Sequence, residues 1–129
     1  MRVAKQVSVM LPNKPGQLEM LCKKLAAARI DLRAVSVVEG ADEAIVRFVA
    51  DKTAVARQLV KEANFGHVVN DVLLIDMVNR PGTMAKVAAQ LTKAGVNIQY
   101  VYGSSAPGAS EAAIVFGVDD LTKAKKVLA

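Results

Sequence analysis

The sequence predicts an α+β fold built from two consecutive units, each with the element order β-α-β-β-α-β. The first observation is an internal repeat: the segment 13–16 (NKPG) recurs at 79–82 (NRPG), an offset of 79 − 13 = 66. The second is that β-rich runs and helical apolar spacing follow one another in the same order in both copies. A repeat of this length exceeds solenoid periods and indicates a duplicated small domain.

The repeat also sets the expected domain boundaries. Further along the chain the offset grows to 69, with Ala44–Val46 matching Ala113–Val115 and Asp51 matching Asp120. We therefore expect the second copy to carry three extra residues in one loop. The predicted domains are residues 1–70 and 71–129.

In the first unit, strand and helix patterns alternate. Leu18, Leu21, Cys22 and Leu25 have the spacing of an amphipathic helix. Pro15 just before them fits the first helical turn, where its missing N–H is harmless. The predicted elements are a strand at 3–10, a helix from 17, strands at 30–38 and 44–49, a helix at 52–63 and a short strand at 68–69.

The second unit repeats this order up to its last strand. We predict a strand at 72–78, a helix closed by Gly95, strands at 98–102 and 112–118, and a helix at 122–128. The fourth strand is missing, and its place is left open, filled by the other unit or filled by a second chain. Because an uncovered strand edge tends to pair, we expect a homo-oligomer, most simply a dimer. Arg29 stands where Gly95 stands in the copy, so the first helix is expected to end differently.

The element order is that of a ferredoxin-like unit, an antiparallel sheet with two helices on one face. The composition, 53% hydrophobic and 22% charged, fits a compact globule. No apolar stretch approaches the roughly 20 residues of a membrane span, no signal pattern opens the chain, and one cysteine excludes an internal disulfide framework. We therefore expect a cytoplasmic protein with no membrane partner.

The net charge of +5 raises the question of nucleic-acid binding. A nucleic-acid site needs basic residues gathered on one surface. Here they are scattered, and the only tight cluster is Lys123, Lys125 and Lys126. We interpret these charges as a solvated face and expect no nucleic-acid partner.

The repeated loop is the strongest candidate for chemistry. It leads from a strand end into a helix N-terminus, whose first N–H groups lack internal partners and favour an anion. The amides of Asn13 and Asn79 carry both a donor and an acceptor, and Gly16 and Gly82 let a ligand approach the backbone. A small zwitterion such as an amino acid suits this arrangement. The alternative is a plain turn with an asparagine cap and a proline.

Asp31 and Asn97 form a second matched pair, just after the first helix of each unit. Their side chains are candidates for a further polar contact to the same ligand. The alternative is that a polar residue simply starts each strand.

Together these motifs, with Gly95-Val96-Asn97-Ile98, resemble the ACT domain, a βαββαβ regulatory module that binds amino acids. The loop is most similar to the serine-binding regulatory domain of phosphoglycerate dehydrogenase, and the whole chain resembles stand-alone tandem ACT proteins. The resemblance implies composite sites that pair Asn13 with Asn97, and Asn79 with Asp31. The family's nearby histidine has no counterpart, because Leu11 and Met77 stand there. The implied ligand-binding set is Asn13, Lys14, Pro15, Gly16, Asp31, Asn79, Arg80, Pro81, Gly82, Thr83, Met84 and Asn97.

Other residues give little support to catalysis. His67 is the only histidine, which excludes a multi-histidine metal site, and we expect it at a turn or strand end. We expect no catalytic residues, no metal and no cofactor. Tyr100 and Tyr102 share a strand face and fit a core or an interface. Met77, Met84 and Tyr100 are candidates to line an apolar pocket for a ligand larger than serine.

The expected function is therefore a non-enzymatic, amino-acid-binding regulatory protein of amino-acid metabolism. One alternative is a stand-alone regulatory subunit of a biosynthetic enzyme, with ligand binding secondary. A second is a small hydrolase of acyl phosphates, with Arg80 as the nearest phosphate-binding candidate. A third is a nucleic-acid-binding protein.

Overall fold

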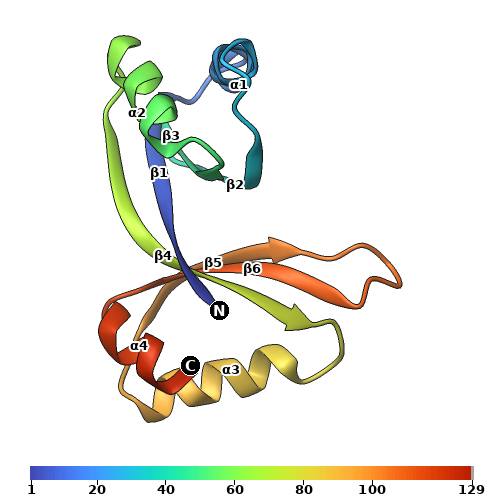
Figure 1. Ribbon diagram of the computed structural model, residues 1–129. Helices are drawn as coiled ribbons and strands as arrows, with labels where there is room; N and C mark the ends of the chain where they lie inside the picture. The colour runs from blue at the N-terminus through green and yellow to red at the C-terminus, as the bar shows by residue number, and fades with distance from the viewer. Residues whose placement is uncertain (129) are drawn as a thin grey trace. The chain divides into compact units, whose positions relative to one another are not determined.

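The computed structural model describes residues 1–128, and it confirms the predicted tandem α+β fold (Figure 1). The chain divides into two compact units, residues 5–70 and residues 1–4 together with the chain from residue 71 onward. The elements are β1 (Arg2–Pro12), α1 (Gln17–Ala27), β2 (Leu32–Glu39), β3 (Glu43–Ala50), α2 (Thr53–Glu62), β4 (His67–Val78), α3 (Thr83–Lys93), β5 (Ile98–Ser104), β6 (Glu111–Val118) and α4 (Leu121–Leu128).

The unit of residues 5–70 is an antiparallel sheet covered on one face by α1 and α2 (Figure 1). Its strand order is β2-β3-β1-β4, with residues 67–70 of β4 at the edge. The core between sheet and helices is apolar, and Phe48, Leu21 and Val60 are almost completely buried in it. Alternate residues of each strand supply this core because side chains of a strand point to opposite faces in turn.

The other unit has the same architecture. Its order is β1-β4-β6-β5, in which only residues 2–4 of β1 take part, and α3 and α4 lie along one face (Figure 1). Phe116 and Leu91 are fully buried in its core. The sequence of the second repeat lacks a fourth strand. The first residues of β1 occupy that position, beside β4. That these units act as the predicted domains 1–70 and 71–129 stays a prediction.

Strand β4 is longer than expected. The sequence predicted two strands, at 68–69 and 72–78, but His67–Val78 form one continuous strand. The two-strand prediction is wrong because Asn70 and Asp71 lower the local hydrophobicity without breaking the backbone. No glycine or proline follows Gly66 in this stretch to interrupt the strand.

The strand register also corrects the alignment of the two repeats. Val35 pairs with Phe48 in the first unit, and Val101 pairs with Phe116 in the second, so the offset on these strands is 116 − 48 = 68. The equivalent of Asp51 is therefore Asp119 rather than Asp120. The insertion is two residues rather than three, and it lies in the loop 105–110 between β5 and β6. The short Ala-Ile-Val match misled the alignment, since the buried phenylalanines fix the true register.

The first helix of each unit ends in the same way, which contradicts the expectation for Arg29. Arg29 has φ 57° and Gly95 has φ 73°, both in the left-handed region. In both helices the next residue closes the helix with a hydrogen bond. The Ile30 N–H donates to the Leu25 carbonyl at 3.0 Å, and the Val96 N–H donates to the Leu91 carbonyl at 2.9 Å. Arginine is thus held in a conformation that favours glycine.

Asn64 ends α2 as predicted, with φ 61°. His67 begins β4, as expected for a strand-end residue, and its Nδ1 lies 3.0 Å from the Phe65 carbonyl oxygen. No helix among the described residues 1–128 is long and apolar enough to cross a membrane.

Candidate functional site

The two repeated loops have nearly identical backbone geometry. Gly16 has φ 89° and Gly82 has φ 92°, and each is the residue directly before its helix. The helices therefore begin at Gln17 and Thr83, and Pro15 lies in the preceding turn rather than in the first helical turn as expected. A Cβ built on either glycine would meet no atom within 4 Å, so the left-handed conformation, and not crowding, requires glycine here.

The loop asparagines fasten the neighbouring hairpin to the loop. Asn79 donates its backbone N–H to the Ser110 carbonyl and its Nδ2 to the Ala109 carbonyl, each at 2.9 Å. Asn13 makes the equivalent bonds to the carbonyls of Asp42 and Gly40, also at 2.9 Å each. Neither asparagine caps the following helix, because no side chain is hydrogen-bonded there. Part of the repeated motif thus has a structural role.

The start of α3 carries no side-chain cap. In α3 the first helical bond runs from the Lys86 N–H to the Gly82 carbonyl, at 3.0 Å. The N–H groups of Met84 and Ala85 precede that bond, so no carbonyl of the helix reaches them. The partial positive charge of the helix N-terminus favours an anion at this point.

A pocket of about 200 Å³ lies beside the second loop. It combines polar groups from the loop and β5 with apolar side chains from β4, α3 and β6. Its lining residues are Met77, Val78, Asn79, Arg80, Thr83, Met84, Ser104, Ser105, Ala112 and Ile114. The structure thus brings together four residues of the predicted ligand-binding set, Asn79, Arg80, Thr83 and Met84, while Pro81 and Gly82 shape the loop between them.

Of the three residues expected to form an apolar wall, the two methionines lie at this pocket and Tyr100 does not. Met77 and Met84 both line the pocket. The Tyr100 ring instead covers Gly117, where an added Cβ would lie 2.2 Å from the ring. It also stacks on Tyr102, with ring centroids 6.5 Å apart.

Sequence reasoning missed Ser104 and Ser105. They lie at the end of β5 and the start of the longer β5–β6 loop, and they bring two hydroxyl groups to the pocket. With the offset of 66 they match Val38 and Glu39 of the first copy, so the change from valine to serine was a signal for this position.

Asn97 and Asp31 lie away from the loops of their own units. The Asn97 N–H donates to Asp119 Oδ1, and the Asp31 N–H to Asp51 Oδ1, each at 2.9 Å. In the second unit, Asn97 thus neighbours the C-terminal end of β6, whereas Asn79 bonds the residue just before its N-terminal end. The two positions are at opposite ends of one strand, so they do not share a ligand within a unit. The composite pairs, Asn13 with Asn97 and Asn79 with Asp31, stay a prediction.

The first loop has different surroundings. Lys14 and Pro15 are exposed, and the pocket next to Gly16 is lined by the surface of α1: Gly16, Glu19, Met20, Lys23 and Lys24. Glu19 and Lys23 pair there, with Oε2 and Nζ 2.6 Å apart. Asn13 is not part of that lining, so the two copies offer a ligand different chemistry.

The fold and the loop geometry define a tandem repeat of one α+β unit, and comparison with known proteins identifies the family. The family described as the ACT domain pair matches residues 1–129, and the chain belongs to it. A comparison with curated proteins found no match.

Solved structures share this fold over almost the whole chain. A protein from Bacteroides thetaiotaomicron is 34% identical, with a TM-score of 0.91, over 98% of this chain and 86% of that one. The ligand-free regulatory subunit of aspartate kinase from Thermus thermophilus is 15% identical, with a TM-score of 0.70, over 99% and 95% of the two chains. The corresponding subunit from Thermus flavus is 16% identical, also with a TM-score of 0.70 and over the same shares.

Proposed function

We propose that this protein is a non-enzymatic, cytoplasmic regulatory protein that senses an amino acid. The observation that carries the proposal is the pocket of about 200 Å³ beside the second loop. It joins the start of α3 with Arg80, the Asn79 amide and an apolar wall. Membership of the ACT domain pair family supports a regulatory rather than a catalytic role.

The pocket offers a separate partner for each part of an amino acid. The ligand carboxylate accepts hydrogen bonds from the free N–H groups of α3 and from Arg80. The Asn79 Nδ2 is already committed to the Ala109 carbonyl, which leaves its Oδ1 as an acceptor for the ligand ammonium group. The ligand side chain packs on Met77, Met84 and Ile114, which favours an apolar residue larger than serine.

Binding regulates by selecting a conformation. A ligand shifts an equilibrium only by the difference in its affinity for the two states. The pocket lies where β4, α3 and the β5–β6 loop meet, so an amino acid held there stabilises one arrangement of that loop. A partner that contacts the loop reads the change.

A thermal-shift screen against the twenty amino acids tests the proposal. A ligand that binds only the folded state raises the melting temperature by mass action. We expect a shift with one or a few apolar amino acids, and Arg80→Gln should weaken that binding by about tenfold or more, because a charge-assisted hydrogen bond is lost.

The matched control is Lys14→Gln, which removes the equivalent cation from the first loop. It should leave the affinity within about twofold, since an exposed charge outside the pocket contributes little. Equal weakening by both variants would show that net charge, and not the pocket, governs binding. No shift with any amino acid would refute the sensing role.

A second candidate function is a stand-alone regulatory subunit of a metabolic enzyme. The observation that favours it is the edge strand β2, on which Val35, Val37 and Val38 are each about half exposed. An apolar strand edge pairs readily with another chain, either a second copy in a homodimer or an enzyme. Light scattering on the purified protein, alone and after Val37→Lys, separates a self-associating edge from one reserved for another protein.

A further inference from the structure

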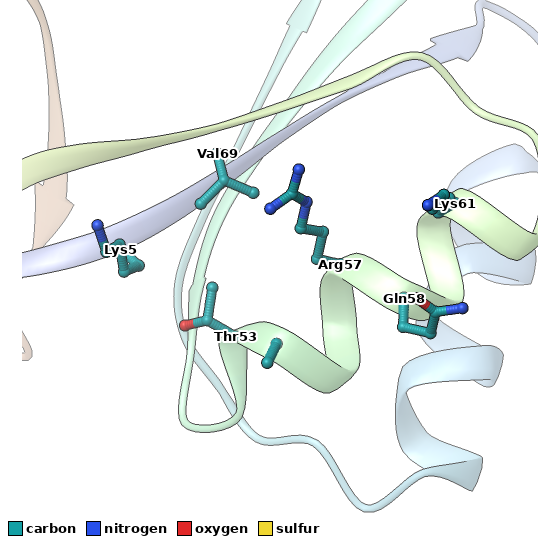
Figure 2. Close-up of a pocket in the computed structure, with 7 residues that line it drawn as sticks. Lys5, Thr53, Arg57, Gln58, Lys61 and Val69 are labelled. Atoms are coloured by element: carbon teal, nitrogen blue, oxygen red, sulfur yellow. The ribbon is translucent and has the colours of Figure 1, made fainter.

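Another pocket, larger than the one beside the second loop, lies within the unit of residues 5–70, between α2 and the strands β1 and β4 (Figure 2). Its volume is about 560 Å³. Its lining residues are Lys5, Thr53, Ala54, Arg57, Gln58, Lys61 and Val69. Figure 2 shows the Arg57 side chain extending from α2 toward Val69, with Lys5 beyond it on β1. None of these residues lines the pocket beside the second loop.

The charge of this lining is entirely positive. Lys5, Arg57 and Lys61 contribute three cations, and no carboxylate is among the lining residues. Within residues 1–128, the side chains of Arg57 and Lys61 make no ion pair and no hydrogen bond. Gln58 donates its Nε2 to Glu62 Oε1 at 3.0 Å, so its acceptor oxygen is the part left for other contacts.

Helix geometry gathers these groups on one face of α2. Thr53, Arg57 and Lys61 are spaced four residues apart, which places them one above another along the helix. Two like charges at this spacing repel each other and destabilise the helix slightly. A bound anion removes that repulsion, so the arrangement favours an occupied state.

The cationic cluster is a property of the first unit and is not imposed by the fold. Val7 pairs with Phe48 and Leu73 pairs with Phe116, so Val7 and Leu73 are equivalent and the offset on these strands is 73 − 7 = 66. With this offset, Lys5 corresponds to Asp71 in the second unit. With the offset of 68, Thr53 corresponds to Leu121 and Arg57 to Lys125. The second copy thus lacks both the strand cation and the helix hydroxyl.

We infer that this pocket binds a small, multiply charged anion carrying phosphate or carboxylate groups. A zwitterion is disfavoured because the lining residues include no carboxylate for its ammonium group. A compound with two or more negative charges uses the guanidinium fork of Arg57 together with Lys61, and Val69 and Ala54 provide apolar contact for its uncharged part. The volume lies within the range of small-molecule sites, roughly 300–1,000 Å³.

Isothermal titration calorimetry tests this with two probes, inorganic pyrophosphate and citrate. We expect one site per chain for at least one probe, and binding should weaken as salt is added. Binding of pyrophosphate alone identifies a phosphate ligand, and binding of citrate alone a carboxylate ligand. Arg57→Gln and Lys61→Gln should each weaken binding by about tenfold or more, since each removes a charge-assisted contact.

Lys125→Gln is the matched control, because it removes the same charge at the position of α4 equivalent to Arg57. It should leave the affinity within about twofold, because an exposed charge outside the pocket contributes little. Arg57, Lys61 and Lys125 are all exposed, so unchanged circular dichroism is expected for each variant. The inference is overturned if neither probe binds at millimolar concentration, or if Lys125→Gln weakens binding as much as Arg57→Gln.

Discussion

Replacing Arg29 by glycine should make the protein more stable, although the change deletes a whole side chain. Arg29 sits at the end of α1 with φ 57°, and its repeat equivalent Gly95 sits at the end of α3 with φ 73°. The Arg29 side chain is exposed and makes no hydrogen bond or ion pair within residues 1–128. Its carbonyl accepts a hydrogen bond from Lys52 Nζ at 3.0 Å, and glycine retains that carbonyl.

The magnitude follows from two opposing terms. The left-handed conformation costs a residue with a Cβ about 1–2 kcal/mol relative to glycine. Glycine also gives the unfolded chain more conformational freedom, which lowers the free energy of unfolding by about 0.5–1 kcal/mol. We therefore expect Arg29→Gly to raise the free energy of unfolding by about 0.5–1 kcal/mol. For a chain of this length that corresponds to a rise in melting temperature of about 2–4 °C.

Urea unfolding followed by circular dichroism measures the effect as a higher midpoint at unchanged slope. Arg29→Ala is the control, because it removes the charge and the long side chain but keeps the Cβ; it should leave stability nearly unchanged. Gly95→Ala should lower stability by about 0.5–1 kcal/mol, since space is free around the added Cβ and only the conformation opposes it. The reasoning is refuted if Arg29→Ala stabilises as much as Arg29→Gly, or if Gly95→Ala has no effect.

Two further predictions concern the second unit. Gly117→Ala should displace the Tyr100 ring, because the added Cβ would lie 2.2 Å from it. The near-UV circular dichroism signal of the stacked tyrosines should therefore fall, and an unchanged spectrum would contradict the packing. Asp119→Ala should lower the free energy of unfolding by about 1 kcal/mol in a urea titration, since it removes the acceptor of the Asn97 N–H. Asp119→Asn keeps an acceptor oxygen and should retain most of the stability. Equal losses in the two variants would argue against that hydrogen bond.

The sequence predicted the fold well because the repeat allowed each element to be read twice. Helix α1 was recognised from the spacing of Leu21 and Leu25, and both are buried as expected. The errors arose where local chemistry is ambiguous. Asn70 and Asp71 suggested a break that the backbone does not have, and Arg29 adopts a conformation for which its residue type gives no signal.

The candidate site was predicted only in part, for a physical reason. The repeated motif pointed to Asn79 and Arg80, but a motif does not reveal which loops fold against it. Ser104 and Ser105 come to the pocket from the end of β5 and the loop after it, a loop whose Ala109 carbonyl accepts a hydrogen bond from Asn79. The cationic pocket of the first unit was also not predicted, since Lys5 is far in sequence from Arg57 and Lys61 and only the fold brings them together.

The most direct test of the central claim is a titration of the isotopically labelled protein with the amino acid that gives the largest thermal shift, followed by two-dimensional NMR of the backbone N–H groups. The proposed site predicts the largest shift changes at Thr83, Met84, Ser104 and Ser105, which line the pocket, and at Ala85 in the first turn of α3. Changes confined to the first loop or to α2, or a spectrum that the amino acid leaves unaltered, would contradict it.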